Sequence, residues 1–172
     1  MIELKFEDCK WGKLMDIFGL ERVKELPLLK EWIHFQTDYI ESELKTLSEI
    51  QELALFRGND MNEDEVKFLL ISPITQLAHF PNQPYAVFTQ RDLRAEINEY
   101  ELKGRVDFLL ATGNQEPKEP FFFIQEYKPA QLRNSDPLGQ VLAAMLVAQF
   151  NNSETSNHPV LGAVVVASTW NF

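Results

Sequence analysis

The stretch Phe121-Phe-Phe-Ile-Gln-Glu-Tyr-Lys128 is an apolar run that ends with charged residues. Aromatic and branched side chains favour β-strands, and a strand this apolar is typical of the centre of a sheet, where both faces are covered. A charged side chain inside such a strand is costly unless it is paired or binds a metal ion. Glu126 and Lys128 therefore mark a candidate functional site at the end of a predicted central strand.

A second apolar stretch, Gly104-Arg-Val-Asp-Phe-Leu-Leu110, places Asp107 within another predicted strand. Residues two apart on a strand share a face, so Glu126 and Lys128 point the same way. If the two strands pair antiparallel, the Asp107 carboxylate lies beside that of Glu126, and the two repel unless a cation lies between them. Mg²⁺ and Mn²⁺ bind carboxylate, water and phosphate oxygens, so these residues predict a Mg²⁺ (or Mn²⁺) site.

The surrounding elements follow from periodicity and turn signals. Asn62 is a suitable N-cap for a helix, and Ser135 or Asp136 caps a second helix that runs from Pro137 to about Phe150. The expected strands are residues 85–89, 93–102, 105–111, 121–128 and 160–167, with Lys103-Gly104 as a turn. Because the last strand follows a helix, it is expected to cross over and lie parallel in the sheet.

Asp107 followed by Glu126-Tyr-Lys128, in the order helix, three strands, helix, strand, resembles the PD-(D/E)xK nuclease superfamily. The residues from Asn62 to Pro73, with Gly-Arg-Val-Asp107 and Glu-Tyr-Lys-Pro129, resemble the nuclease domain of type I restriction enzyme motor subunits and their free-standing relatives. The resemblance implies an α/β fold with a mixed central sheet, namely a restriction-endonuclease-like core at residues 62–172. It also implies an endonuclease, a hydrolase of DNA phosphodiester bonds.

The resemblance implies a role for each site residue. Asp107 and Glu126 bind the metal, and Lys128 acts on the attacking water. The alternative for these three residues is a partly buried cluster of ion pairs without catalysis. Arg105 either contacts phosphate or pairs with Asp107, and pairing is the preferred interpretation.

Superfamily members often add a Glu from the first core helix, which here corresponds to Glu63 or Glu65. Glu63 is preferred because it shares a helical face with apolar residues of that helix. A Gln on the helix after the lysine strand corresponds to Gln140. The alternatives are a helix acid favoured by the dipole for Glu63, and a surface or capping amide for Gln140.

Residues 1–61 are predicted to form a helical N-terminal segment packed on the core. Residues 31–56 contain no Pro or Gly, and apolar residues recur there at helical spacing. These are Ile40, Leu44, Leu47 and Ala54. Such a stripe is a packing face, so the segment is also a candidate contact for a second copy of the chain or for a partner subunit.

Composition limits the protein class. The chain has 172 residues, of which 45% are hydrophobic, enough for one domain with a core. Its apolar runs are shorter than the ~20 residues of a membrane span, its start is unlike a signal peptide, and it has one cysteine. We therefore expect a cytoplasmic protein with no membrane partner.

The net charge of −10 opposes DNA binding by bulk electrostatics. Alternatives to an independent nuclease therefore stay open. One is a catalytically inactive nuclease-like fold that acts as a binding or assembly module in a larger complex. Another is a subunit that becomes active only with its partner.

Overall fold

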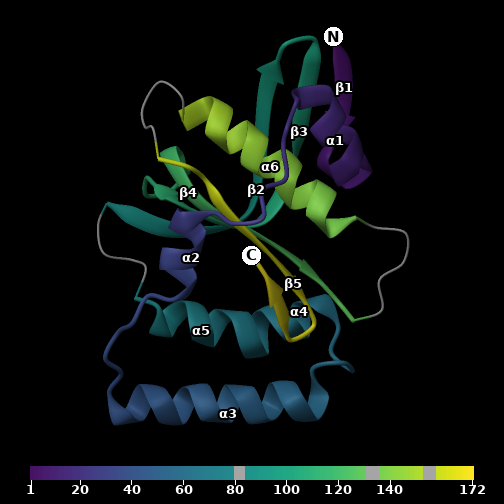
Figure 1. Ribbon diagram of the computed structural model, residues 1–172. Helices are drawn as coiled ribbons and strands as arrows, with labels where there is room; N and C mark the ends of the chain where they lie inside the picture. The colour runs from purple at the N-terminus through teal and green to yellow at the C-terminus, as the bar shows by residue number, and fades with distance from the viewer. Residues whose placement is uncertain (80–83, 131–135, 153–157) are drawn as a thin grey trace.

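The computed structural model describes residues 1–79, 84–130, 136–152 and 158–172 of an α/β protein (Figure 1). The strands are β1 (Ile2–Lys5), β2 (Tyr85–Ile97), β3 (Tyr100–Thr112), β4 (Lys118–Lys128), β5 (Leu161–Val166) and β6 (Thr169–Asn171). The helices are α1 (Trp11–Phe18), α2 (Pro27–Ile33), α3 (Glu41–Arg57), α4 (Glu63–Val66), α5 (Ser72–Leu77) and α6 (Pro137–Asn152). Two short helical turns are η1 (Phe6–Asp8) and η2 (Lys67–Ile71).

The sheet is mixed and curled, with β4 at its centre. Strands β2, β3 and β4 pair antiparallel in sequence order, and β5 returns parallel to β4 after helix α6. The parallel placement of the last predicted strand is thereby confirmed. Strand β4 is flanked by β3 and β5 and covered on both faces, as its apolar sequence predicted.

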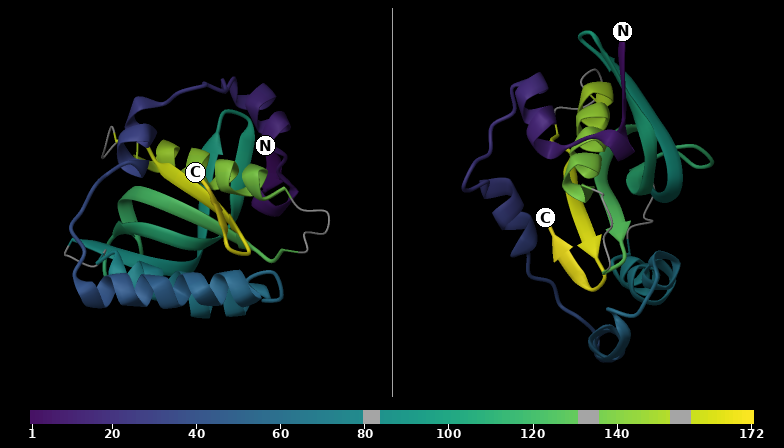
Figure 2. Two further views of the ribbon diagram at one scale, coloured as in Figure 1. Left: turned by 60° about the horizontal axis from the view of Figure 1, so that its bottom comes forward. Right: turned by 90° about the vertical axis from the view of Figure 1, so that its right-hand side faces the viewer.

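Helices cover both faces of the sheet. Helix α6 crosses one face, where its small and branched residues pack on β3, β4 and β5. The continuous helix α4–η2–α5 covers the other face through Val66, Leu70 and Ile71, and α3 lies outside it (Figures 1 and 2). Among the described residues, no helix combines the length and apolarity needed to cross a membrane.

The helix that begins at Asn62 starts where the sequence predicted. The Asn62 side chain accepts the Glu65 N–H at 2.9 Å, and the Glu65 side chain accepts the Asn62 N–H at 2.9 Å. This reciprocal capping box satisfies backbone donors that the first helical turn leaves unpaired. Lys67 opens the wider π-helical turn η2, and the chain returns to α-helix at Ser72.

Helix α6 also begins with a capping residue. The Asp136 carboxylate accepts the Gly139 N–H at 3.0 Å, with Pro137 at the first helical position. The alternative cap, Ser135, lies outside the described residues. At the other end, the buried Asn152 side chain binds both the N–H and the C=O of Phe121 at 2.7 Å, which ties α6 to β4.

The predicted turn at Lys103-Gly104 is wrong. Both residues lie within β3, and the hairpin instead turns at Asn98 and Glu99, with Asn98 at a φ of 57°. Asparagine tolerates this left-handed conformation better than most residues. Gly104 is needed because the Phe6 side chain packs directly on the strand there, and a Cβ would lie 2.4 Å from Phe6 Cγ.

The N-terminal segment is not wholly helical as predicted, because it begins with strand β1. This strand pairs parallel with β3 from Ile2 to Lys5, so the segment contributes to the sheet itself. Helix α1 then packs on α6, where the Trp11 N–H donates to the Asp136 carboxylate at 3.1 Å. Strand β6, which pairs antiparallel with β5, was also missed.

The contact between Phe6 and Gly104 predicts a selective loss of stability. Gly104→Ala is expected to lower the free energy of unfolding by about 1–3 kcal/mol, since the added methyl overlaps the Phe6 side chain. The measurement is urea unfolding followed by circular dichroism. Gly12→Ala is the control, because nothing lies within 4 Å of its Cβ position, and alanine in a helix raises stability by up to ~1 kcal/mol. Equal effects at the two positions would contradict the prediction.

Candidate functional site

The site forms where strands β3 and β4 separate. Their antiparallel pairing runs to Phe108 opposite Gln125 and stops before Asp107 and Glu126. In place of a backbone hydrogen bond between the strands, the Asp107 side chain accepts the Tyr127 N–H through Oδ2 at 2.9 Å. A carboxylate therefore holds the two strands at the point of separation.

Strand β2 reaches the same carboxylate from the other side. The pairing of β2 with β3 skips Gln90 opposite Asp107, and Gln90 has a φ of 54°. This conformation is uncommon for a residue with a side chain and costs on the order of 1–3 kcal/mol. In it, Gln90 Nε2 donates to Asp107 Oδ1 at 2.7 Å. Sequence reasoning missed Gln90, because no local pattern indicates a left-handed residue within a strand.

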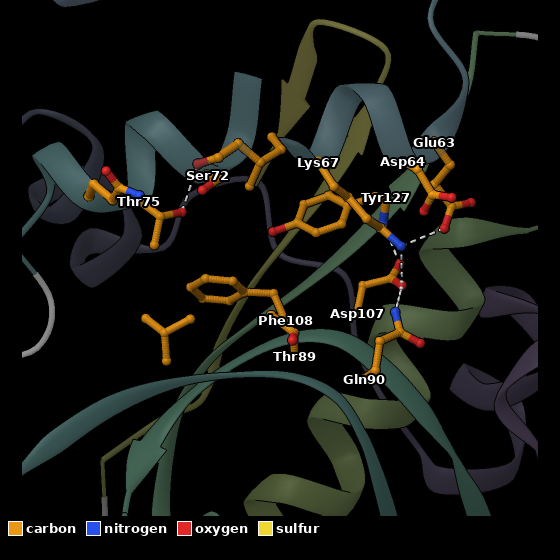
Figure 3. A pocket seen from close by; sticks show the side chains of 13 residues that line it. Glu63, Asp64, Lys67, Ser72, Thr75, Thr89, Gln90, Asp107, Phe108 and Tyr127 are labelled. Atoms are coloured by element: carbon orange, nitrogen blue, oxygen red, sulfur yellow. Dashed lines mark hydrogen bonds and ion pairs between the residues drawn. The ribbon is translucent and has the colours of Figure 1, made fainter. Parts of the chain in front are cut away.

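Lys67 brings the helix α4–η2 to this point. Its Nζ lies 2.6 Å from Glu63 Oε1, one helical turn before it, and 2.8 Å from Asp107 Oδ1 (Figure 3). These residues, with Gln90, form the polar end of a cavity of about 650 Å³ that is walled by Phe108 and Tyr127. Sequence reasoning also missed Lys67, although its four-residue spacing from Glu63 is a recognisable helical ion-pair signal.

Glu126 and Lys128 share one face of β4, opposite to the face that carries Tyr127, as their spacing predicted. Lys128 Nζ donates to Glu126 Oε1 at 2.6 Å, and both line a second hollow of about 500 Å³ together with Gln140. The Gln140 Oε1 atom is buried and has no hydrogen-bond partner among the described residues. An unsatisfied buried acceptor marks a place where a donor can still bind.

Arg105 lines the second hollow but does not pair with Asp107. Its guanidinium binds Asp92, with Nε 3.0 Å from Oδ1, so the preferred interpretation of Arg105 is corrected. Glu65, the alternative to Glu63, is engaged in the capping box and with Arg57 at 3.4 Å.

The predicted residues thus divide between two hollows. Glu63 and Asp107 line the first, whereas Glu126, Lys128 and Gln140 line the second.

The charged groups of the two hollows influence one another's pKa values. Burial, and then the negative charges of Asp107 and Glu63, raise the pKa of Glu126 to about 7, against the opposing effect of Lys128. Burial alone would lower the pKa of Lys67, but hydrogen bonds and charge from Asp107 and Glu63 raise it above its ordinary value. The three carboxylates are therefore close enough to influence one another, and two ammonium groups offset most of their charge.

The chemistry of this donor set fits a hard divalent cation. Mg²⁺ is commonly held by one or two carboxylates, with water and phosphate completing its shell. As the side chains lie, no three acidic, histidine or cysteine residues converge tightly enough to hold an ion in the part of the chain that the structure describes. Asp107 and Glu126 supply two carboxylates on adjacent strands, and Lys67 stands between Glu63 and Asp107.

No protein family, curated protein or solved structure matches this chain in comparison. The function must therefore be inferred from the residues of the site.

The raised pKa of Glu126 predicts a pH-dependent stability. Between its ordinary value of 4.5 and about 7, the folded state holds a proton that the unfolded state has lost. Stability therefore falls as pH rises through this window, by on the order of 3 kcal/mol from this group. Glu126→Gln is expected to flatten that part of the pH profile, measured by urea unfolding from pH 4.5 to 8 without metal.

Glu116→Gln is the matched control, because the Glu116 side chain is mostly exposed. It should retain the pH dependence of the unaltered chain. A Glu126→Gln profile that is as steep as that of the control would show that Glu126 does not retain its proton in the folded state.

Proposed function

We propose that this chain is a metal-dependent endonuclease with a restriction-endonuclease-like core, related to the PD-(D/E)xK superfamily. The observation that carries the proposal is the position of Asp107 at the separation of two strands, where its charge acts on Glu126, which in turn pairs with Lys128. Carboxylates on adjacent strands with a neighbouring lysine are suited to holding Mg²⁺ or Mn²⁺ next to a phosphate.

The element order supports the same proposal. A helix precedes three antiparallel strands, and a second helix leads to a parallel strand. The first helix brings Glu63 to Asp107 through Lys67, and the second places Gln140 in the hollow of Glu126. Elements distant in the sequence therefore supply acidic and amide groups to one end of β4.

Each residue of the proposed site has a defined task. A bound Mg²⁺ or Mn²⁺ supplies Lewis-acid activation of the phosphate and of a water molecule. Asp107 and Glu126 hold the ion, and the Tyr127 N–H together with Gln90 fixes the orientation of the Asp107 carboxylate. The Lys128 ammonium orients the attacking water and stabilises negative charge that develops on the phosphate.

DNA is the proposed substrate despite the acidic net charge. The hollow beside Glu126 is lined by four cationic side chains and three acidic ones. The cationic residues are Lys5, Lys103, Arg105 and Lys128, and the acidic ones are Glu7, Asp92 and Glu126. Lys103, Arg105 and Lys128 already pair with acidic side chains, so a bound metal ion would supply the net positive charge that a phosphate needs here.

A catalytically inactive module is the second candidate. It is favoured by the internal pairing of Asp107 with Lys67 and of Glu126 with Lys128, which is also expected of a structural ion-pair cluster. Exposed apolar residues on the helical side suit contact with a second copy or a partner subunit. Leu55, Phe56 and Phe68 are 82%, 85% and 76% exposed. Such a module would show no metal-dependent shift in melting temperature.

The proposal predicts metal binding and cleavage that depend on the same carboxylate. The unaltered chain is expected to bind Mn²⁺ in calorimetry and to cut DNA in Mg²⁺. Asp107→Asn keeps the shape of the side chain and an acceptor for the Tyr127 N–H, but loses the charge. It should abolish Mn²⁺ binding and reduce cleavage by at least ~100-fold.

A change at Lys128 tests catalysis separately from metal binding. Lys128→Met is expected to retain Mn²⁺ binding while losing cleavage to a similar degree, because the lysine acts on the water rather than on the ion. Lys118→Met, a change to an exposed lysine outside both hollows, should leave cleavage intact. Full cleavage by Asp107→Asn and Lys128→Met would refute the nuclease assignment.

A further inference from the structure

Lys67 lies where a cation is needed between two carboxylates. Its Nζ is 2.6 Å from Glu63 Oε1 and 2.8 Å from Asp107 Oδ1, and its side chain is 23% exposed. The ammonium also lies 5.5 Å from the centre of the Tyr127 ring. An aromatic face and two carboxylates thus surround one positive charge.

Both Asp107 oxygens accept hydrogen bonds, and Oδ1 accepts two. Oδ2 accepts the Tyr127 N–H, whereas Oδ1 accepts hydrogen bonds from both Lys67 and Gln90. A carboxylate oxygen has about two lone-pair directions, so Oδ1 has no free direction for a metal ion. A divalent ion can bind Oδ1, or both oxygens together, only if one of these two donors leaves.

Lys67 is the donor better able to leave. Gln90 is fixed by its strained position within β2, whereas Lys67 carries its ammonium on a flexible four-carbon stem. A divalent ion that binds Asp107 also repels the ammonium 2.8 Å from Oδ1, while the amide of Gln90 carries no charge.

We propose that Lys67 is the resident cation of the site, which holds Glu63 and Asp107 together until a divalent metal ion displaces it. This inference rests on the proposed function, because it concerns the same metal-binding carboxylate. Lys67 is thus a positioning residue that stabilises the metal-free site and competes with metal loading.

Removal of the ammonium is expected to act in opposite directions on stability and on metal affinity. Lys67→Met keeps the apolar stem beside Tyr127 but leaves Glu63 and Asp107 without their shared cation. The melting temperature of the metal-free protein should therefore fall, whereas the Mn²⁺ affinity measured by calorimetry should rise at least ~10-fold. A lysine with a purely structural role predicts weaker Mn²⁺ binding, because its loss would disorder the carboxylates.

Lys45 offers a control outside both hollows. Its Nζ lies 3.9 Å from Glu49 Oε1, an ion pair at the same four-residue spacing as that of Lys67 with Glu63. Lys45→Met should leave the Mn²⁺ affinity unchanged.

A second measurement requires no variant. The unaltered protein is treated with an amine-reactive acylating reagent, with and without Mg²⁺, and the extent of modification of each lysine is determined by mass spectrometry. Displacement predicts that Mg²⁺ increases the modification rate of Lys67 several-fold and leaves that of Lys45 unchanged. This readout stands even if Lys67→Met does not fold.

The outcomes separate this inference from the proposed function. If the unaltered protein binds Mn²⁺, but Lys67→Met binds no more tightly and Mg²⁺ does not expose Lys67 to the reagent, the displacement is refuted and the nuclease proposal stands. If neither protein binds Mn²⁺, both fail, because there is no ion for Lys67 to exclude.

Discussion

The hydrogen bond from the Tyr127 N–H to Asp107 Oδ2 is the interaction on which the rest of the site depends. It lets β3 and β4 separate without leaving a backbone donor unsatisfied, which would cost about 1–3 kcal/mol. Near the separation, Lys67 reaches Asp107 from the helix α4–η2, and Gln140 of α6 lines the hollow of Glu126. Because one carboxylate serves both the sheet and the site, structural and chemical demands on Asp107 are inseparable.

Charge balance is the second constraint. Glu63, Asp107 and Glu126 carry three potential negative charges, and Lys67 and Lys128 supply two positive ones. Burial, together with the negative charges of Asp107 and Glu63, raises the pKa of Glu126 to about 7. A proton on Glu126 and the ammonium of Lys67 therefore both offset the negative charge of one partly buried cluster.

The sequence predicted those parts of the site that depend on local rules. Two-residue periodicity placed Glu126 with Lys128, and helix capping located the starts of α4 and α6. The expected pairing of Asp107 with Glu126 stops one residue short, at Phe108 opposite Gln125. The sequence could not predict Gln90, whose side chain reaches Asp107 only through an unusual backbone conformation within the assembled sheet. The Lys103-Gly104 error has a similar cause, because glycine is required there by Phe6, which is far upstream in the sequence.

The pairing of β1 with β3 has a consequence for how the chain reaches its native state. Strand β1 has no partner until Tyr100–Lys103 have been made, and helix α1 has none until α6 exists. These contacts close long loops, which slows their formation relative to the β2–β3 hairpin. Until β1 docks, the edge of β3 that it later covers carries unpaired N–H and C=O groups, and such an edge can recruit another strand. Residues 2–5 are thus made long before their partner strand, and they cover this part of β3 once they dock.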